Sequence, residues 1–137
     1  MNFPINASCQ CGQVTYKLFE TPQNVIACHC KECQKLSTSA YSITAIVPTK
    51  AIEFTGEMKH WTRIADSGNK NSGYFCSNCG TRIYQFNPEQ PDSIKLKLKP
   101  VDKESESLFE PKIHVWTSEK LGWVQIPDGI KTAEKQR

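Results

Sequence analysis

The sequence predicts a small, mostly β domain with little helix, in which clustered cysteines hold the sheets together. Short segments with alternating or β-branched residues recur along the chain, helical periodicity is scarce, and all seven cysteines fall in three tight clusters. A chain of 137 residues fits one domain. We expect residues 1–130 to form it and residues 131–137 to be a frayed tail, because that tail lacks apolar periodicity.

Seven segments are expected to be strands. Residues 14–18 and 94–98 alternate apolar and polar side chains, as half-buried strands do. Residues 41–47 are rich in β-branched and aromatic side chains and stop at Pro48. Residues 52–55 and 59–64 should form a hairpin that turns near Gly56. The remaining expectations are strands at 81–86 and 112–117, a loop at 66–72 and one short helix at 31–36.

The setting of the cysteines favours metal binding or catalysis over disulfides. The first eight residues lack a signal-peptide pattern, and no stretch approaches the roughly 20 apolar residues of a membrane helix. We therefore expect a cytoplasmic protein without a membrane partner, in a compartment that keeps thiols reduced. A full disulfide framework would also leave one of the seven cysteines unpaired.

The cysteines form two pairs and one triplet. In chain order the motifs CxCG, CxCxxC and CxxCG contain Cys9 and Cys11, then Cys28, Cys30 and Cys33, then Cys76 and Cys79. Zinc prefers four tetrahedral ligands, with sulfur at about 2.3 Å, and closely spaced cysteines supply two or three of them from one turn. The glycine after each pair supplies the positive φ with which the backbone bends around a metal.

The count of thiols suggests two different sites. The two pairs would complete a four-cysteine structural site, and the triplet would then keep an open coordination position, as catalytic zinc sites do. Spacing alone also allows Cys28 and Cys30 to close the first site, or one or two cysteines to remain free. Zinc with three thiolates carries a net charge of −1. Such a site should therefore bind a further thiol as thiolate rather than generate hydroxide.

Other polar and aromatic residues are given structural roles. Seven thiolates with two zinc ions would cancel the formal charge of +3, so the charge does not indicate nucleic acid. His114 should lie in the core, and His29 should have a structural or solvent-facing role. The alternating lysines Lys95, Lys97 and Lys99 should form a solvated strand face. The tryptophans, Trp61, Trp116 and Trp123, are expected in the core or in a pocket wall.

The ordered motifs CxCG, CHCxxCQK and FCxxCG resemble the glutathione-dependent formaldehyde-activating family, which includes the centromere-protein-V-like proteins. Residues 34–40 follow the triplet as they do in that family, and Phe75 precedes the last pair. Residues 111–116, followed by Trp123, resemble the family's closing strand. The resemblance spans roughly residues 8–127 and includes all seven family cysteines.

The resemblance implies an Mss4-like fold of zinc-clamped β-sheets with two zinc ions per chain, the second being the easier to remove. It implies a carbon–sulfur lyase similar to S-(hydroxymethyl)glutathione synthase. The implied substrates are a small aldehyde and a thiol such as glutathione. The implied ligands are Cys9, Cys11, Cys76 and Cys79 for a structural zinc, and Cys28, Cys30 and Cys33 for a catalytic zinc.

One departure from the family pattern concerns substrate recognition. Family members often carry an arginine shortly before the last cysteine pair, where this chain has Asn-Ser-Gly-Tyr at residues 71–74 and Lys70 is the nearest cation. Two alternatives to the lyase remain, a non-catalytic thiol-binding protein and a zinc-stabilised interaction module. The sequence has no long basic or Pro/Ala-rich segment, which argues against the interaction module.

Overall fold

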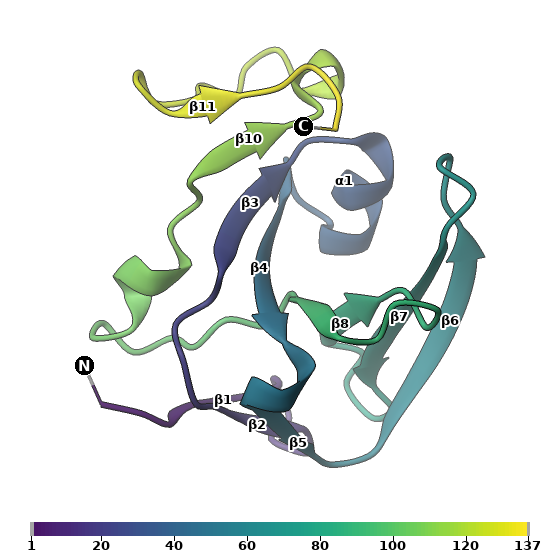
Figure 1. The fold of residues 1–137 in the computed structure, drawn as a ribbon, viewed down its shortest axis with the longest axis vertical. Helices are drawn as coiled ribbons and strands as arrows, with labels where there is room; N and C mark the ends of the chain where they lie inside the picture. The colour runs from purple at the N-terminus through teal and green to yellow at the C-terminus, as the bar shows by residue number, and fades with distance from the viewer. Residues whose placement is uncertain (1, 137) are drawn as a thin grey trace.

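Two β-sheets contain most of the regular secondary structure in this computed structural model, which describes residues 2–136 (Figure 1). The smaller sheet has the order β1-β2-β5, formed by β1 (Ile5–Ser8), β2 (Thr15–Leu18) and β5 (Ile52–Thr55). The larger sheet has the order β11-β10-β3-β4-β9-β8-β7-β6. The predicted mostly β fold is confirmed.

The larger sheet contains the remaining strands, and the helix lies in the chain between two of them. Its strands are β3 (Asn24–Cys28), β4 (Ser42–Pro48), β6 (Met58–Ile64), β7 (Lys70–Cys76), β8 (Arg82–Phe86), β9 (Ser93–Leu96), β10 (Ile113–Val115) and β11 (Lys131–Thr132). One α-helix occurs in the described residues, α1 (Lys31–Ser37), together with three 3-10 turns at Thr49–Ala51, Glu106–Phe109 and Thr117–Glu119. No helix within residues 2–136 has the length and apolar character needed to cross a membrane.

Local interactions explain why α1 begins and ends where it does. The Cys30 sulfur caps its first turn by accepting a hydrogen bond from the Cys33 N–H, and Glu32 lies in that turn, where the helix dipole favours a negative charge. Lys35 lies in the last turn, and the helix ends at Thr38, whose φ is 48°. The predicted helix is confirmed, and its first turn holds one cysteine of the triplet at a fixed position.

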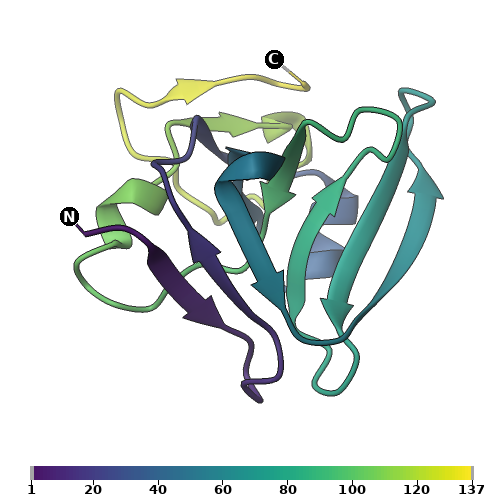
Figure 2. The same ribbon diagram turned by 60° about the horizontal axis from the view of Figure 1, so that its bottom comes forward.

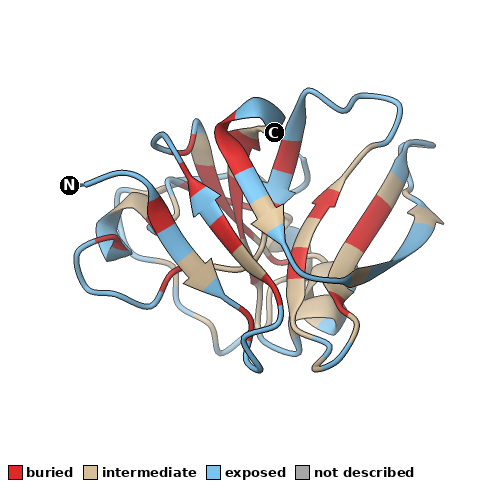
Figure 3. Ribbon diagram, turned by 90° about the horizontal axis from the view of Figure 1, so that it is seen from below, coloured by how far each residue is buried: buried red, intermediate tan, exposed pale blue. Residues whose placement is uncertain are grey.

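The main core lies between the two sheets, and buried residues fall on strands of both (Figures 2 and 3). Each fully buried aliphatic or aromatic side chain stabilises the fold by about 1.5–3 kcal/mol. The buried residues of this main core are Ile5, Tyr16, Leu18, Val25, Ala45, Val47, Ile52, Ile94, Leu96 and Phe109. A second cluster of Cys9, Val14, Cys76 and Ile83 joins the core to two of the cysteine motifs.

The hairpin predicted from residues 52–55 and 59–64 is wrong. Strand β5 pairs with β2 in the small sheet, whereas β6 pairs with β7 in the large one. The turn at Gly56 therefore carries the chain from one sheet to the other. Strands β1, β3, β7 and β11 were not predicted, and β7 begins inside the polar segment that was expected to be a loop.

The C-terminal segment pairs with the large sheet as far as the structure describes it. Strand β11 lies parallel to β10, with Lys131 opposite Ile113. The Trp116 N–H donates to the Lys135 carbonyl at 3.1 Å, and the Thr117 N–H donates to the Ala133 carbonyl at 3.1 Å. Residues 131–137 were expected to fray because they lack apolar periodicity. Backbone hydrogen bonds to a neighbouring strand do not require that periodicity.

Candidate metal centres

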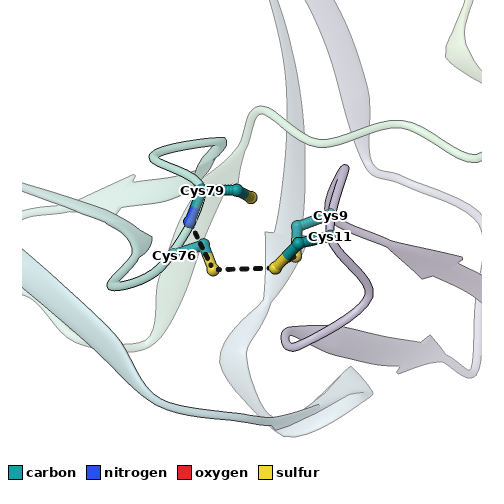
Figure 4. Close-up of side chains that lie close together, drawn as sticks. All are labelled: Cys9, Cys11, Cys76 and Cys79. Atoms are coloured by element: carbon teal, nitrogen blue, oxygen red, sulfur yellow. Dashed lines mark hydrogen bonds between the residues drawn. The ribbon is translucent and has the colours of Figure 1, made fainter.

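Four cysteines from two distant parts of the chain converge on one point (Figure 4). Cys9 and Cys11 lie in the loop after β1, and Cys76 and Cys79 lie at the end of β7 and in the turn that follows. Their four sulfur atoms all lie within 4.8 Å of one another. The Cys11 sulfur is 3.7 Å from those of Cys9 and Cys76. A tetrahedron with zinc–sulfur bonds of about 2.3 Å has edges of about 3.8 Å, so this donor set fits zinc.

Tight turns hold each pair in place. In the first turn the Cys9 N–H donates to the Val14 carbonyl at 2.9 Å, and the Gly12 N–H donates to the Cys9 carbonyl at 3.1 Å. In the second the Gly80 N–H donates to the Cys76 carbonyl at 3.0 Å. Gly12 and Gly80 have φ of 86° and 79°, so the predicted need for positive φ after each pair is confirmed.

Hydrogen bonds to these sulfurs favour their deprotonated form, and the pKa values of Cys9 and Cys79 are lowered, whereas burial and the neighbouring thiols leave the pKa of Cys76 raised. The Val14 N–H donates to the Cys9 sulfur at 3.3 Å, and the Cys79 N–H donates to the Cys76 sulfur at 3.4 Å. Hydrogen bonding from Thr81 lowers the pKa of Cys79 to about 5. Donors directed at a thiolate stabilise its charge, which suits metal ligation.

The triplet forms a second, separate group. Cys28 ends β3, Cys30 caps α1 and Cys33 lies in the first turn of that helix. Their three sulfur atoms lie within 4.8 Å of one another, and all three residues are partly exposed. No sulfur of the triplet belongs to the four-sulfur group. The described residues thus offer one set of four thiols and one set of three, and each could hold a metal ion.

A half-buried lysine lies beside the triplet. The Lys97 ammonium donates hydrogen bonds to the Thr44 hydroxyl at 2.5 Å and the Ser42 hydroxyl at 3.3 Å. Burial lowers the pKa of Lys97, and negative charge on Cys33 acts in the opposite direction. The predicted solvated face is therefore right for the exposed Lys95 and wrong for Lys97 and Lys99, which are both partly buried. Alternation showed that these lysines share a face, but not that α1 and the triplet cover part of it.

Two buried histidines lie next to the triplet and connect it to β10. His29, between Cys28 and Cys30, has no exposed surface, and its Nε2 lies 2.8 Å from Nδ1 of His114. The His29 N–H also donates to the Val115 carbonyl at 3.0 Å. Burial, reinforced by the neighbouring His114, lowers the pKa of His29. The core position predicted for His114 is confirmed, and the pair ties the triplet loop to β10.

Charge within the triplet is shared unequally. Hydrogen bonds from Cys28 and Cys30 lower the pKa of Cys33. The hydrogen bond with Cys30 raises the pKa of Cys28. Closely spaced thiols cannot all ionise without a compensating positive charge, which a divalent metal ion supplies.

Comparisons with known proteins find relatives of this sequence. A protein of Halomonas elongata provisionally named a glutathione-dependent formaldehyde-activating enzyme is 21% identical over 127 residues, which cover 89% of this chain and 80% of that protein. An Emericella nidulans protein with the same provisional name is 29% identical over 86 residues. That match covers 61% of this chain and less than half of the fungal protein, at 43%.

The fold also has a counterpart among solved structures. The crystal structure of a Rhodobacter sphaeroides protein superimposes with a TM-score of 0.55 at 16% identity, covering 78% of this chain and 97% of that one. This likeness concerns the fold alone. The family model of the glutathione-dependent formaldehyde-activating enzyme matches residues 4–119, a span that includes all seven cysteines. The chain therefore belongs to the glutathione-dependent formaldehyde-activating enzyme family.

Proposed function

We propose that this protein is a zinc-dependent carbon–sulfur lyase that adds a thiol, glutathione or a close relative, to a small aldehyde such as formaldehyde. The observation that carries the proposal is the division of the thiols into a complete set of four and a separate, partly exposed set of three. In this account Cys9, Cys11, Cys76 and Cys79 hold a structural zinc, and Cys28, Cys30 and Cys33 hold the catalytic one.

The two donor sets differ in what they leave available. Four thiolates fill a tetrahedral site, whereas three leave one position for a small molecule. Zinc bound by Cys28, Cys30 and Cys33 would hold an incoming thiol in its nucleophilic thiolate form. The partial exposure of these three residues gives a small thiol access.

The surrounding residues support the addition by position and charge. The thiol sulfur forms the new bond to the aldehyde carbon, the carbonyl π electrons move to oxygen, and that oxygen takes up the proton lost by the thiol. Negative charge therefore develops on oxygen beside the triplet. Lys97 is the cation held there by Ser42 and Thr44, so its ammonium is placed to stabilise that charge.

The rate of the uncatalysed reaction is the reference against which catalysis must be measured. Thiols add to formaldehyde without a catalyst, so the expected gain comes mainly from holding the two reactants together. A protein that only binds the thiol would share the same site and give no acceleration. The rate above the spontaneous background is therefore the quantity that separates a lyase from a thiol-binding protein.

The test measures the formation of the thiol–formaldehyde adduct from glutathione and formaldehyde by NMR exchange. We expect the wild-type protein, with its full metal content, to accelerate formation well above the protein-free rate. Cys30→Ser should return the rate to background, and Lys97→Met should reduce it about 10-fold or more. A wild-type rate equal to that of Cys30→Ser would contradict the lyase proposal.

A further inference from the structure

A cavity lies between α1 and the strands β6, β7 and β8. Its volume is about 270 Å³, and the side facing the helix is lined by Glu32, Lys35 and Leu36. The sheet side is lined by Trp61, Arg63, Asn71, Gly73, Arg82 and Gln85. We call this cavity the arginine groove. The same helix, α1, carries Cys33 of the triplet in its first turn, and Figure 1 shows that helix beside the large sheet.

The groove contains two guanidinium groups without a protein counter-ion. Among the described residues neither Arg63 nor Arg82 forms a salt bridge, whereas Glu32 already pairs with Lys35 at 3.0 Å. Both arginines are partly buried. Arginine presents a planar fork of donors that matches a carboxylate, so an unpaired pair of arginines in a cavity favours an anionic ligand.

A glycine in the middle of β7 makes room for one of these arginines. A Cβ at Gly73 would lie 2.5 Å from Nη1 of Arg82 and 3.6 Å from the Gln85 amide nitrogen. Gly73 lies opposite Gln85 in the β7–β8 pair and opposite Trp61 in the β6–β7 pair. Glycine inside a strand often marks a close approach to the backbone. Here the group that approaches is the Arg82 guanidinium.

The groove also offers an acceptor that no protein group satisfies. Oδ1 of Asn71 is buried and has no hydrogen-bond partner, while its amide nitrogen lies 3.5 Å from Oε1 of Gln85. Buried polar atoms are normally paired, so an unpaired acceptor in a cavity wall indicates a donor from a ligand or water. Two guanidinium groups beside a hydrogen-bond acceptor suit the amino-acid end of a ligand, which carries both a carboxylate and an ammonium group.

One face of the large sheet connects the groove to the triplet. Directly opposed residues on neighbouring strands share a face, and Ile46, Lys95 and Gln85 are opposed across β4, β9 and β8. Two residues further along β4, on the same face, lies Thr44, which accepts a hydrogen bond from Lys97, just beyond the end of β9 and near Cys33 of the triplet. Strands β4 and β7 are separated by three strand spacings, a distance of about 14 Å.

We infer that the arginine groove binds the carboxylate end of the thiol substrate, with Arg82 and Arg63 as the residues that select for it. The groove would then favour a carboxylate-bearing thiol, such as the glutathione of the proposed function, over a simple alkyl thiol. An extended tripeptide spans about 10 Å, and arginine side chains reach several ångströms further, so one molecule bridges groove and triplet. The identity of this substrate as a thiol rests on the proposed function, whereas carboxylate binding in the groove does not.

The test uses S-methylglutathione, which keeps both carboxylates and the amino group but has no free thiol. Isothermal titration of the metal-loaded protein should show binding, and Arg82→Gln or Arg63→Gln should weaken it about 10-fold or more. Gly73→Ala should weaken it as well, because the added methyl group displaces the Arg82 guanidinium. The diethyl ester of S-methylglutathione, which lacks both free carboxylates and a free thiol, should bind the wild type as poorly as S-methylglutathione binds Arg82→Gln.

Two controls separate this inference from general charge effects and from the lyase proposal. Lys70→Gln removes an equal charge from β7 outside the groove, at a residue paired with Glu89 at 3.7 Å, and should change affinity less than twofold. S-methylglutathione has no free thiol and cannot add to an aldehyde, so its binding is measured independently of the lyase proposal. Equal affinity in the wild type, Arg82→Gln and Arg63→Gln, or no binding by the wild type, would overturn the inference.

Discussion

At the scale of single residues, Tyr16 shows how the core depends on one polar atom. Its ring is 1% exposed at the centre of the main core, and its hydroxyl donates to the Leu98 carbonyl at 2.8 Å. That hydrogen bond lets a phenol lie in an apolar cluster without an unsatisfied donor. Burial, with the negative charge of Asp102, raises the pKa of Tyr16.

This pKa shift predicts a loss of stability in alkaline solution. The unfolded chain releases the Tyr16 proton at its usual pKa of about 10, before the folded protein does. The stabilisation is therefore fully present below about pH 10 and decreases as the pH rises above it. Tyr16→Phe should cost about 1 kcal/mol at neutral pH and should flatten the alkaline decrease, as measured by urea unfolding from pH 7 to 11. Parallel curves for the two proteins would contradict this assignment.

The residue scale also shows what sequence patterns omit. Alternation identified the face that Lys95 and Lys97 share, but only tertiary structure reveals that Lys97 lies beside the triplet. Arg82 drew no attention in the sequence, because its role depends on the missing side chain of Gly73 on the adjacent strand. Because the strand that contains Gly73 was not predicted, the sequence alone gave no sign of this close approach.

At the scale of elements, the turn at Gly56 determines how the two sheets meet. Gly56 has a φ of 102°, and a Cβ there would lie 2.0 Å from the Gln13 carbonyl oxygen. The turn after β5 therefore packs directly on the backbone of the loop that carries Cys9 and Cys11. This close approach lets the chain pass from the small sheet to the large one beside the four-sulfur site.

Gly56→Ala should therefore destabilise the fold through both φ and contact. We expect a loss of at least about 2 kcal/mol, because a backbone segment must move to admit the methyl group. Gly68→Ala is the matched control, since Gly68 also has positive φ, at 87°, but its Cβ would meet nothing within 4 Å. That control should lose only about 1 kcal/mol. Equal losses in thermal or urea unfolding would show that the contact with Gln13 does not matter.

Strands with a strong local sequence pattern were predicted correctly. Strands that form mainly through pairing with neighbouring strands were not. Residues 14–18, 41–47, 81–86 and 94–98 were recognised from alternation or β-branched content. Strand β7 was missed because Ser, Gly and Asn have weak strand propensity, and it exists through pairing with β6 and β8 on both sides. The hairpin at Gly56 failed for a related reason, since a turn residue does not say whether its flanking strands pair with each other.

At the scale of the whole molecule, the four-sulfur site joins the two sheets. Cys9 and Cys11 follow a strand of the small sheet, and Cys76 and Cys79 close a strand of the large one. A metal held by both pairs cross-links segments about 65 residues apart, which restricts the unfolded chain as well as supporting the core. The triplet, by contrast, belongs to one continuous stretch of chain.

The two sites should therefore respond differently to loss of a ligand. Cys76→Ser should unfold the protein or lower its melting temperature by more than about 10 °C, since Cys76 is buried and bridges the sheets. Cys33→Ser should remain folded with about one metal ion fewer per chain. Metal content by mass spectrometry and circular dichroism before and after mild chelation check both outcomes. Equal unfolding of the two variants would contradict the division of roles.

The cysteine grouping was the part of the site that the sequence predicted best, because ligand spacing is local and the number of thiols is small. Spacing alone still allowed Cys28 and Cys30 to join the first group. The structure places them near Cys33 instead, since the end of β3 leads directly into α1. The arginine groove was beyond prediction, because its walls come from four separate elements.

The central claim is that the triplet holds a metal ion with one position that a thiol fills. Cobalt-substituted protein reports this directly, because each thiolate bound to cobalt adds to the sulfur-to-metal absorption in the near ultraviolet. Titration with glutathione should raise that absorption and saturate at one glutathione per chain, and Cys33→Ser should lose the response. An absorption that stays unchanged at saturating glutathione, or a response that Cys33→Ser retains in full, would contradict the account.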